Sequence, residues 1–234
     1  MAGNRAHLLI MAGEGIGPEV VAEECRIAEW FMAERGLEAE LTTELYGIEA
    51  YRAHGRLLRE EAIPLMAAAD AVLFGAAGGL AYTELPPEVR KAGTLLRIRK
   101  SLDLYANLRP IRGLAALAEA STLKPETREG VDLVIVRELS SGMYFGEPRG
   151  VETLPDGRRR GVNTHAYTSD EIERVARVAF ELARGRRNHV TSVDKANVME
   201  AGKLWREVVE DLHKRDYADV ELTHMLADNC AMQL

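Results

Sequence analysis

Apolar residues in this chain gather in short runs that alternate with longer stretches of helical spacing. A strand is predicted at residues 7–11, and the helix after it has apolar positions that include Val20 and Ile27 and ends near Gly36. Residues 37–45 are typical of a second strand. This order of strand, helix and strand predicts a βαβ unit with a right-handed crossover.

The turn between the first strand and the first helix is rich in glycine. Gly13, Gly15 and Gly17 form the pattern G-x-G-x-G, which differs from the dinucleotide-binding fingerprint G-x-G-x-x-G. A tight strand-to-helix turn and a nucleotide cradle are both consistent with this pattern.

The alternation of strands and helices continues to the end of the chain. Strands are predicted at 70–75, 131–136, 189–193 and from 220, and helices at 60–69, 94–104, after an N-cap at Ser169 and at 199–213. Residues 223–234 predict a mostly buried helix, in which the Asp228 carboxylate needs either a metal or cation or a hydrogen-bonding or capping role. A mixed α/β sheet protein is therefore expected.

Polar residues crowd the carboxyl end of the 131–136 strand, which is expected to be buried on both faces. Arg137, Ser140, Ser141 and Tyr144 follow it directly, and open α/β sheets place ligand-binding groups at the carboxyl ends of their strands. These residues predict a site that holds an anionic substrate and moves a proton. A strand followed by a polar turn explains them equally well.

A second cationic segment precedes that strand. The 94–104 helix carries Arg97, Arg99 and Lys100, and Arg109 follows it. The planar fork of an arginine binds a carboxylate through two parallel hydrogen bonds, so one of these arginines is a candidate substrate ligand. The alternative interpretation is a solvated basic face above a packed apolar one.

A strong turn signal, Pro155-Asp156-Gly157, lies between residues 151–154 and 158–164. It predicts a projecting hairpin within an arm at about 143–168. Such a hairpin either pairs with another copy of the chain or is a plain surface hairpin.

Composition argues against several classes of protein. The 234 residues carry a formal net charge of -7, which disfavours a nucleic-acid-binding protein. No apolar stretch approaches the ~20 residues that span a bilayer, and the N-terminal residues lack the pattern of a signal peptide. Cys25 and Cys230 give neither a disulfide framework nor zinc-ligand spacing, so a cytoplasmic location is expected.

Several motifs in combination resemble the β-decarboxylating dehydrogenases, a family whose members act on isopropylmalate, isocitrate, homoisocitrate and tartrate. The motifs occur in the family's order over essentially the whole chain. They are GEGIGPEV (13–20), LLRIRKSLDLYANLRP (95–110), VRELSSGMYFGEPRG (136–150), VDKANV (193–198), LWREVV (204–209) and ADNCAMQL (227–234).

The resemblance implies an α/β, isopropylmalate dehydrogenase-like fold, with mixed open sheets, helices on both faces, and domains at 1–108 and 109–234. It is strongest to the isopropylmalate branch, since Leu95 is apolar where an isocitrate enzyme needs a polar neighbour for an extra carboxylate. The implied reaction is oxidative decarboxylation of 3-isopropylmalate to 2-oxoisocaproate with NAD, in leucine biosynthesis.

The resemblance also implies roles for individual residues. Arg99, Arg109 and Arg137 match three arginines that clamp the malate part of the substrate. The remaining matches are Tyr144 and Lys195 for proton transfer, Leu95, Leu96 and Val198 for the wall around the isopropyl group, Ile16 and Asn197 for the cofactor, and Asp228 for the metal.

By the same resemblance, a divalent metal (Mg²⁺ or Mn²⁺) and the arginines hold the 2-hydroxy acid, and K⁺ is a further candidate ion. Lys195 accepts the hydroxyl proton while hydride passes to the nicotinamide, carbon dioxide is lost, and Tyr144 supplies a proton. In this family the lysine and the aspartate at position 228 come from the neighbouring subunit, which implies a homodimer with shared active sites.

Some positions depart from the family pattern. Glu14 replaces the usual aspartate, residues 140–142 replace T-G-G, and residues 91–93 stand where an acidic residue near the nicotinamide is usual. Family members also continue for roughly another hundred residues, so an incomplete first domain lacking two metal aspartates is expected. The alternatives are a tartrate, malate or homoisocitrate dehydrogenase, and a truncated, non-catalytic binding or assembly protein.

Overall fold

The computed structural model describes residues 5–234, and of Leu80 only the backbone. The chain divides into two compact units, Met1–Asp103 (unit 1) and Leu104–Leu234 (unit 2). The division falls five residues before the expected domain boundary at residue 108, because the strand that begins at Ala106 already pairs within unit 2.

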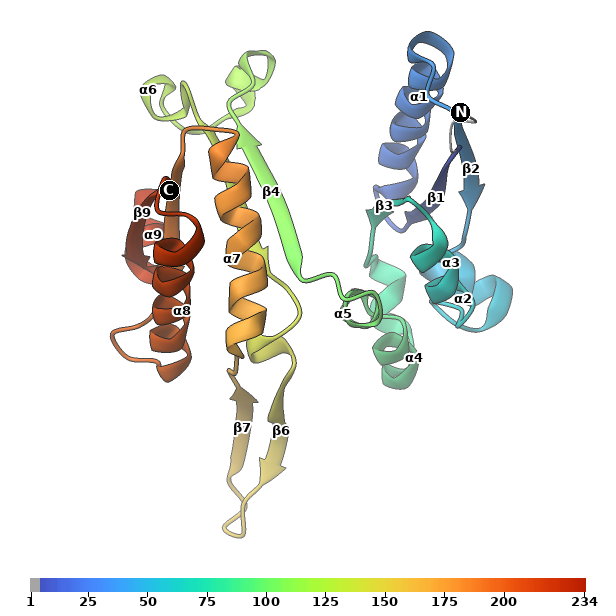
Figure 1. The fold of residues 1–234 in the computed structure, drawn as a ribbon. Helices are drawn as coiled ribbons and strands as arrows, with labels where there is room; N and C mark the ends of the chain where they lie inside the picture. Colours follow the sequence, from blue (N-terminus) through green and yellow to red (C-terminus); the bar gives the residue numbers. More distant parts are fainter. Residues whose placement is uncertain (1–4) are drawn as a thin grey trace. The chain divides into compact units, whose positions relative to one another are not determined.

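Unit 1 is built around a three-stranded parallel sheet in the order β2-β1-β3 (Figure 1). Strand β1 precedes α1 in the chain and β2 follows it, and the two strands pair in parallel. The predicted βαβ unit is therefore confirmed. The elements of unit 1 are β1 (Ala6–Gly13), α1 (Gly17–Arg35), β2 (Ala39–Thr43), α2 (Ile48–His54), α3 (Ala62–Ala68), β3 (Ala71–Ala76), the 3-10 helix η1 (Leu80–Glu84), α4 (Pro87–Ala92) and α5 (Leu95–Ser101).

Helix α1 begins and ends at the residues that its sequence signals predict. Pro18 stands in the first turn, where its missing N–H removes no helical hydrogen bond. Gly36 ends the helix in the left-handed conformation, with φ 68°, and donates its N–H to the carbonyl of Phe31.

The apolar core of unit 1 joins its central strand to α3 and α5. Met11 of β1 is fully buried, and Ile98 of α5 packs into the same cluster. The buried members are Leu9, Met11, Tyr46, Leu58, Ala62, Met66 and Ile98. Because Ile98 anchors α5, this core fixes the helix that carries three of the predicted substrate-binding residues.

Unit 2 contains three separate pairs of strands: β4–β5 and β6–β7 are antiparallel, and β8–β9 are parallel. Its elements are β4 (Ala106–Arg112), η2 (Ala115–Ala120), α6 (Pro125–Arg128), β5 (Asp132–Glu138), η3 (Gly142–Tyr144), β6 (Gly146–Thr153), β7 (Arg159–Thr164), α7 (Ser169–Arg184), β8 (His189–Asp194), α8 (Glu200–Asp216), β9 (Glu221–Leu226) and α9 (Ala227–Gln233).

The core of unit 2 lies where α7 and α8 pack side by side against β8 (Figure 1). Ile172, Phe180 and Leu212 are fully buried there. Phe180 stacks on Tyr217 with ring centroids 4.8 Å apart. Aromatic stacking of this kind adds to the free energy gained by burying apolar area.

The start of α7 differs by one residue from the prediction. Thr168, not Ser169, is the N-cap, and it forms a capping box with Glu171. The Thr168 hydroxyl accepts from the Glu171 N–H, and the Glu171 carboxylate accepts from the Thr168 N–H at 2.8 Å. In this arrangement a threonine and a glutamate three positions later each accept the unpaired N–H of the other, which is why Thr168 takes the role.

The C-terminal helix is shorter and more exposed than predicted. The strand β9 continues through Leu226, and only Ala227–Gln233 is helical. Asp228 is exposed on it, as is Met232 at 84%.

The expectation that β5 is buried on both faces is also wrong, because its residues are mostly half-buried and Ile135 is 37% exposed.

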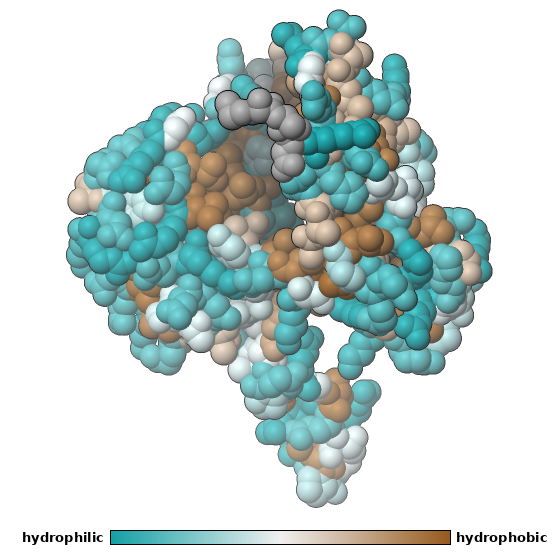
Figure 2. Space-filling view, turned by 45° about the vertical axis from the view of Figure 1, so that its right-hand side comes forward, coloured by the Kyte–Doolittle hydropathy of each residue, from teal (hydrophilic) through white to brown (hydrophobic). Residues whose placement is uncertain are grey.

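The hairpin predicted around residue 156 is present as β6 and β7, which extend away from α7 (Figure 1). Its surface, at the bottom of Figure 2, is mostly hydrophilic with scattered apolar residues. Val151 is 65% exposed on it. Within the described residues, no helix combines the length and the apolar character needed to cross a membrane.

Candidate functional site

Two of the predicted arginines share one face of the β4–β5 pair. The register places Asn107 opposite Arg137 and Arg109 opposite Ile135. Alternate residues of a strand share a face, and so do residues directly opposite each other. Asn107, Arg109 and Arg137 therefore project to the same side, where Arg109 Nε donates to Asn107 Oδ1 at 2.7 Å.

Arg137 also lies against the predicted proton donor. Its guanidinium carbon is 5.4 Å from the ring centroid of Tyr144, a cation–π arrangement. Tyr144 is 48% exposed, so its ring is held while one side remains open to a ligand. The sequence placed these two residues seven positions apart, and the η3 turn brings them together.

Glu138 organises the turn that follows Arg137, a role that the sequence did not indicate. Its buried carboxylate accepts the N–H of Ser140 at 2.7 Å and that of Ser141 at 3.1 Å. The Ser140 hydroxyl donates to Glu138 and the Ser141 hydroxyl to Glu171. The two hydroxyls therefore hold the turn, and the expectation that they grip a substrate is not supported.

Lys195 and Asp228 form an ion pair at the ends of neighbouring strands. Strand β8 ends directly before Lys195, β9 ends two residues before Asp228, and the register pairs Asp194 with Leu226. Lys195 Nζ donates to Asp228 Oδ1. This hydrogen bond lowers the pKa of Asp228 below its usual range, so the carboxylate is ionised at neutral pH. The partner expected for Asp228 is thus a cation of this chain.

The buried side chain of Asp194 stabilises the turn that carries Lys195. The Asp194 side chain is fully buried, and it binds Arg206 through both oxygens, each at 3.0 Å. Asp194 Oδ1 also accepts the N–H of Ala196 at 2.9 Å. A paired and hydrogen-bonded buried carboxylate fixes local geometry. Two features of the sequence could have indicated the Asp194–Arg206 ion pair: the position of Asp194 next to Lys195, and the arginine of the LWREVV motif.

A metal that this family uses would find one ligand here. Within residues 5–234, no three His, Cys, Asp or Glu side chains gather into a group that could hold a metal ion. Asp228 is exposed and ionised, and Mg²⁺ commonly takes one or two protein carboxylates together with water and substrate oxygens. Asp228 could therefore provide one carboxylate ligand to a Mg²⁺ ion whose other ligands are water and substrate oxygens.

The remaining predicted residues of unit 2 lie in the same turn as Lys195. Asn197 and Val198 precede α8, and both are exposed, Val198 at 68%. An exposed apolar residue beside an ion pair is available to a ligand that carries both a charged and an apolar part.

In unit 1, α5 carries Leu95, Leu96 and Arg99, all half-buried. Leu95 packs against the core of unit 1. Thr94 caps the helix by accepting the Arg97 N–H. Ile16, in the glycine-rich turn, is 58% exposed. Arg99 therefore belongs to one unit of the chain, whereas Arg109 and Arg137 belong to the other.

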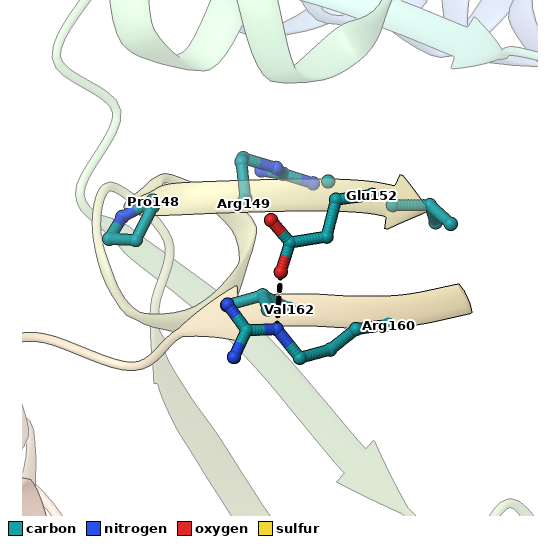
Figure 3. Close-up of a pocket in the computed structure, with 7 residues that line it drawn as sticks. Pro148, Arg149, Glu152, Arg160 and Val162 are labelled. Atoms are coloured by element: carbon teal, nitrogen blue, oxygen red, sulfur yellow. Dashed lines mark hydrogen bonds and ion pairs between the residues drawn. The ribbon is translucent and has the colours of Figure 1, made fainter. Parts of the chain in front are cut away.

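A shallow pocket lies elsewhere in unit 2, on the β6–β7 hairpin (Figure 3). Its labelled residues include Arg149, Glu152 and Arg160, and Glu152 accepts a hydrogen bond from Arg160 across the hairpin. None of the residues predicted for the site lines this pocket.

The sequence model of the isocitrate/isopropylmalate dehydrogenase family matches residues 7–234. The chain belongs to this family. The fold inferred from the motifs is confirmed by a solved structure, a β-decarboxylating dehydrogenase from Thermococcus kodakarensis, with a TM-score of 0.70 and 30% identity over 98% of this chain and 60% of the other.

Curated relatives point to one branch of the family. The chain is 58% identical over 227 residues to a 3-isopropylmalate dehydrogenase from Gluconobacter oxydans, covering 97% of this chain and 62% of the relative. It is 53% identical over 231 residues to 3-isopropylmalate dehydrogenase 1 from Bradyrhizobium diazoefficiens, covering 99% of this chain and 61% of the relative. The chain thus spans about three fifths of the length of these relatives.

Proposed function

We propose that this chain acts in the oxidative decarboxylation of 3-isopropylmalate to 2-oxoisocaproate, with NAD and a divalent metal, in leucine biosynthesis. The observation that carries the proposal is the Lys195–Asp228 pair at the ends of two parallel strands. It joins a candidate proton acceptor to a candidate metal ligand, in a chain 58% identical to a 3-isopropylmalate dehydrogenase.

The substrate is held by charge at one end and by apolar contact at the other. Arg109 and Arg137, on one face of the β4–β5 pair, together with Arg99 bind its two carboxylates through charge-assisted hydrogen bonds. Leu95, Leu96 and Val198 receive the isopropyl group. An apolar wall of this kind leaves an extra carboxylate unpaired, which disfavours isocitrate.

Two side chains move the protons of the reaction. In its uncharged form, Lys195 would accept the proton of the substrate hydroxyl. Ile16 and Asn197 would contact the nicotinamide cofactor, which when bound accepts the hydride from the adjacent carbon. After loss of carbon dioxide, Tyr144 supplies a proton to the product, and Arg137 holds the phenol ring in place. A bound Mg²⁺ or Mn²⁺, held in part by Asp228, supplies positive charge that offsets the negative charge developing on the substrate oxygen.

The active protein is a homodimer with shared active sites. Lys195 and Asp228 contact each other within one chain. One subunit can therefore contribute both side chains to the active site of its partner. The exposed β6–β7 hairpin offers strands through which two copies can pair. K⁺ is a further candidate ion, and a cytoplasmic location agrees with two cysteines that form no disulfide.

The test is an assay of the purified chain with 3-isopropylmalate, NAD, Mg²⁺ and K⁺. Formation of NADH and of carbon dioxide in equal amounts is expected. Parallel reactions with tartrate, malate and homoisocitrate decide the substrate, and turnover of one of these but not of isopropylmalate would overturn the assignment.

A non-catalytic binding or assembly protein is the second candidate, because residues 5–234 gather no group of three His, Cys, Asp or Glu side chains that could hold a metal ion. Calorimetry distinguishes the two. Binding of isopropylmalate without any reduction of NAD would favour the binding protein over the enzyme.

A further inference from the structure

Glu14 is a buried carboxylate in the turn between β1 and α1, only 7% exposed. Its side chain reaches two other segments. Oε1 accepts the N–H of Ile48 at 2.8 Å, and Oε2 accepts the N–H of Gly78 at 2.7 Å. Ile48 is the first residue of α2, and Gly78 follows β3.

The three segments joined by Glu14 all leave the same edge of the sheet. Strand β1 lies between β2 and β3 in a parallel sheet, so the chain that follows each strand emerges at the carboxyl edge. Glu14 follows the central strand and therefore reaches the segment after each neighbouring strand. Its own N–H donates to the carbonyl of Ala76, the last residue of β3, at 2.8 Å, which is the third hydrogen bond between Glu14 and a neighbouring segment.

The space around the side chain is closely fitted. Gly47 adopts φ 80°, and a Cβ there would lie 2.4 Å from the Glu14 Cγ. A residue larger than glycine at position 47 would displace the carboxylate. The backbone before α2 is thus shaped around Glu14, and a carboxylate that accepts two backbone N–H groups in a buried position fixes the segments that carry them.

Ile16, the proposed cofactor contact, lies two residues after Glu14 and is 58% exposed. Ligands of parallel α/β sheets bind at the carboxyl edge of the strands, where these loops lie. We propose that Glu14 is a positioning residue: it ties the glycine-rich turn to the segments at Ile48 and Gly78 and so holds Ile16 in the orientation that the nicotinamide cofactor meets. This inference rests on the proposed use of NAD.

The test compares Glu14→Gln with Glu19→Gln, which removes the same charge from an exposed position in the first turn of α1. Two quantities are measured on the whole chain: hydrogen exchange at the Ile48 and Gly78 amides, and the Kd for NADH. In Glu14→Gln the amide NH₂ faces one of the two N–H donors, so faster exchange at those amides and a roughly 10-fold higher Kd are expected. Glu19→Gln is expected to change neither.

Wild-type exchange rates in Glu14→Gln would overturn the contacts, and faster exchange with an unchanged Kd would overturn the positioning role. If Glu14→Gln fails to fold by circular dichroism, Glu14→Asp takes its place. It keeps the charge but is one methylene shorter, so loss of one contact and a smaller rise in Kd are expected, and wild-type values of both would overturn the inference.

The failure of the proposed function gives a different result. A wild-type chain that binds NADH but does not oxidise isopropylmalate contradicts the substrate assignment and leaves the Glu14 measurement interpretable. A wild-type chain that binds no NADH overturns the inference itself.

Discussion

Lys195 donates a hydrogen bond to Asp228, although the two residues are 33 positions apart in the chain. The contact follows from the parallel pairing of β8 and β9, whose ends lie side by side. Asp194 fixes the turn that carries Lys195, because its carboxylate accepts hydrogen bonds from Arg206 and from the Ala196 N–H. The geometry around Lys195 is therefore set by strand pairing and by a buried ion pair.

Replacement of Lys195 by methionine tests its role as the proton acceptor. Loss of a general base lowers turnover by roughly 10²–10⁴-fold. Lys203→Met removes an equal charge from α8, where Lys203 pairs with Glu200 outside the site, and it is expected to retain activity. NADH formation from isopropylmalate is the measurement. Near-normal turnover of a folded Lys195→Met protein would remove this role.

Tyr144→Phe separates the phenol hydroxyl from the ring that lies against Arg137. The ring contact stays in the variant, so we expect substrate affinity within about twofold of wild type and a fall in kcat of about 10²-fold or more, from the lost proton donor. Steady-state kinetics with isopropylmalate measure both. An unchanged kcat would contradict the assignment of Tyr144 as the acid.

The elements whose apolar spacing is regular were predictable from the sequence, and the contacts between them were not. The βαβ unit, α7, α8 and the hairpin all lie close to their predicted places. The C-terminal helix was misplaced because residues 223–226 pair with β8, which no local pattern reveals. Individual arginines could be chosen from their motifs. Their shared face on β4 and β5 depends on the strand register, which exists only in the folded chain.

The carboxylates that organise the site were also beyond the reach of the sequence. Glu14, Glu138 and Asp194 are buried and bind backbone N–H groups of loops. A glutamate in a glycine-rich turn or after a strand is usually solvated, so only tertiary packing distinguishes these three.

Phe180→Ala tests the core that supports the site in unit 2. Phe180 is fully buried and stacks on Tyr217, so its truncation is expected to lower the free energy of unfolding by about 3–5 kcal/mol. Met232→Ala, at an exposed position of α9, is expected to change it by about 0.5 kcal/mol or less. Denaturant unfolding monitored by circular dichroism measures both. Equal effects would place the core elsewhere.

Asp219 makes stability depend on pH. Two hydrogen bonds from Arg184, at 2.6 and 2.9 Å, hold the pKa of Asp219 below its usual range. A carboxyl with a depressed folded-state pKa stabilises the fold above its unfolded pKa of about 3.9, and this contribution is lost as the pH falls through the folded value. Asp219→Asn should therefore destabilise the protein at neutral pH, and the difference from wild type should shrink below about pH 4.

The control for this titration is Asp211→Asn, because the Asp211 carboxylate is exposed and lies 4.0 Å from Lys214. It is expected to change stability little at any pH. Urea unfolding of the three proteins across the acid range gives the answer, and a difference for Asp219→Asn that does not vary with pH would contradict the ion pair.

In the proposed function, Arg109 and Arg137, which share one face of the β4–β5 pair, bind the same dicarboxylic acid. Isothermal calorimetry of isopropylmalate binding to Arg109→Met and Arg137→Met tests this directly, with Arg112→Met, on the opposite face of β4, as the matched control. Each site variant is expected to bind about 10–100-fold more weakly, and the control within about twofold of wild type. Wild-type affinity in both site variants, or equal weakening by Arg112→Met, would contradict the account.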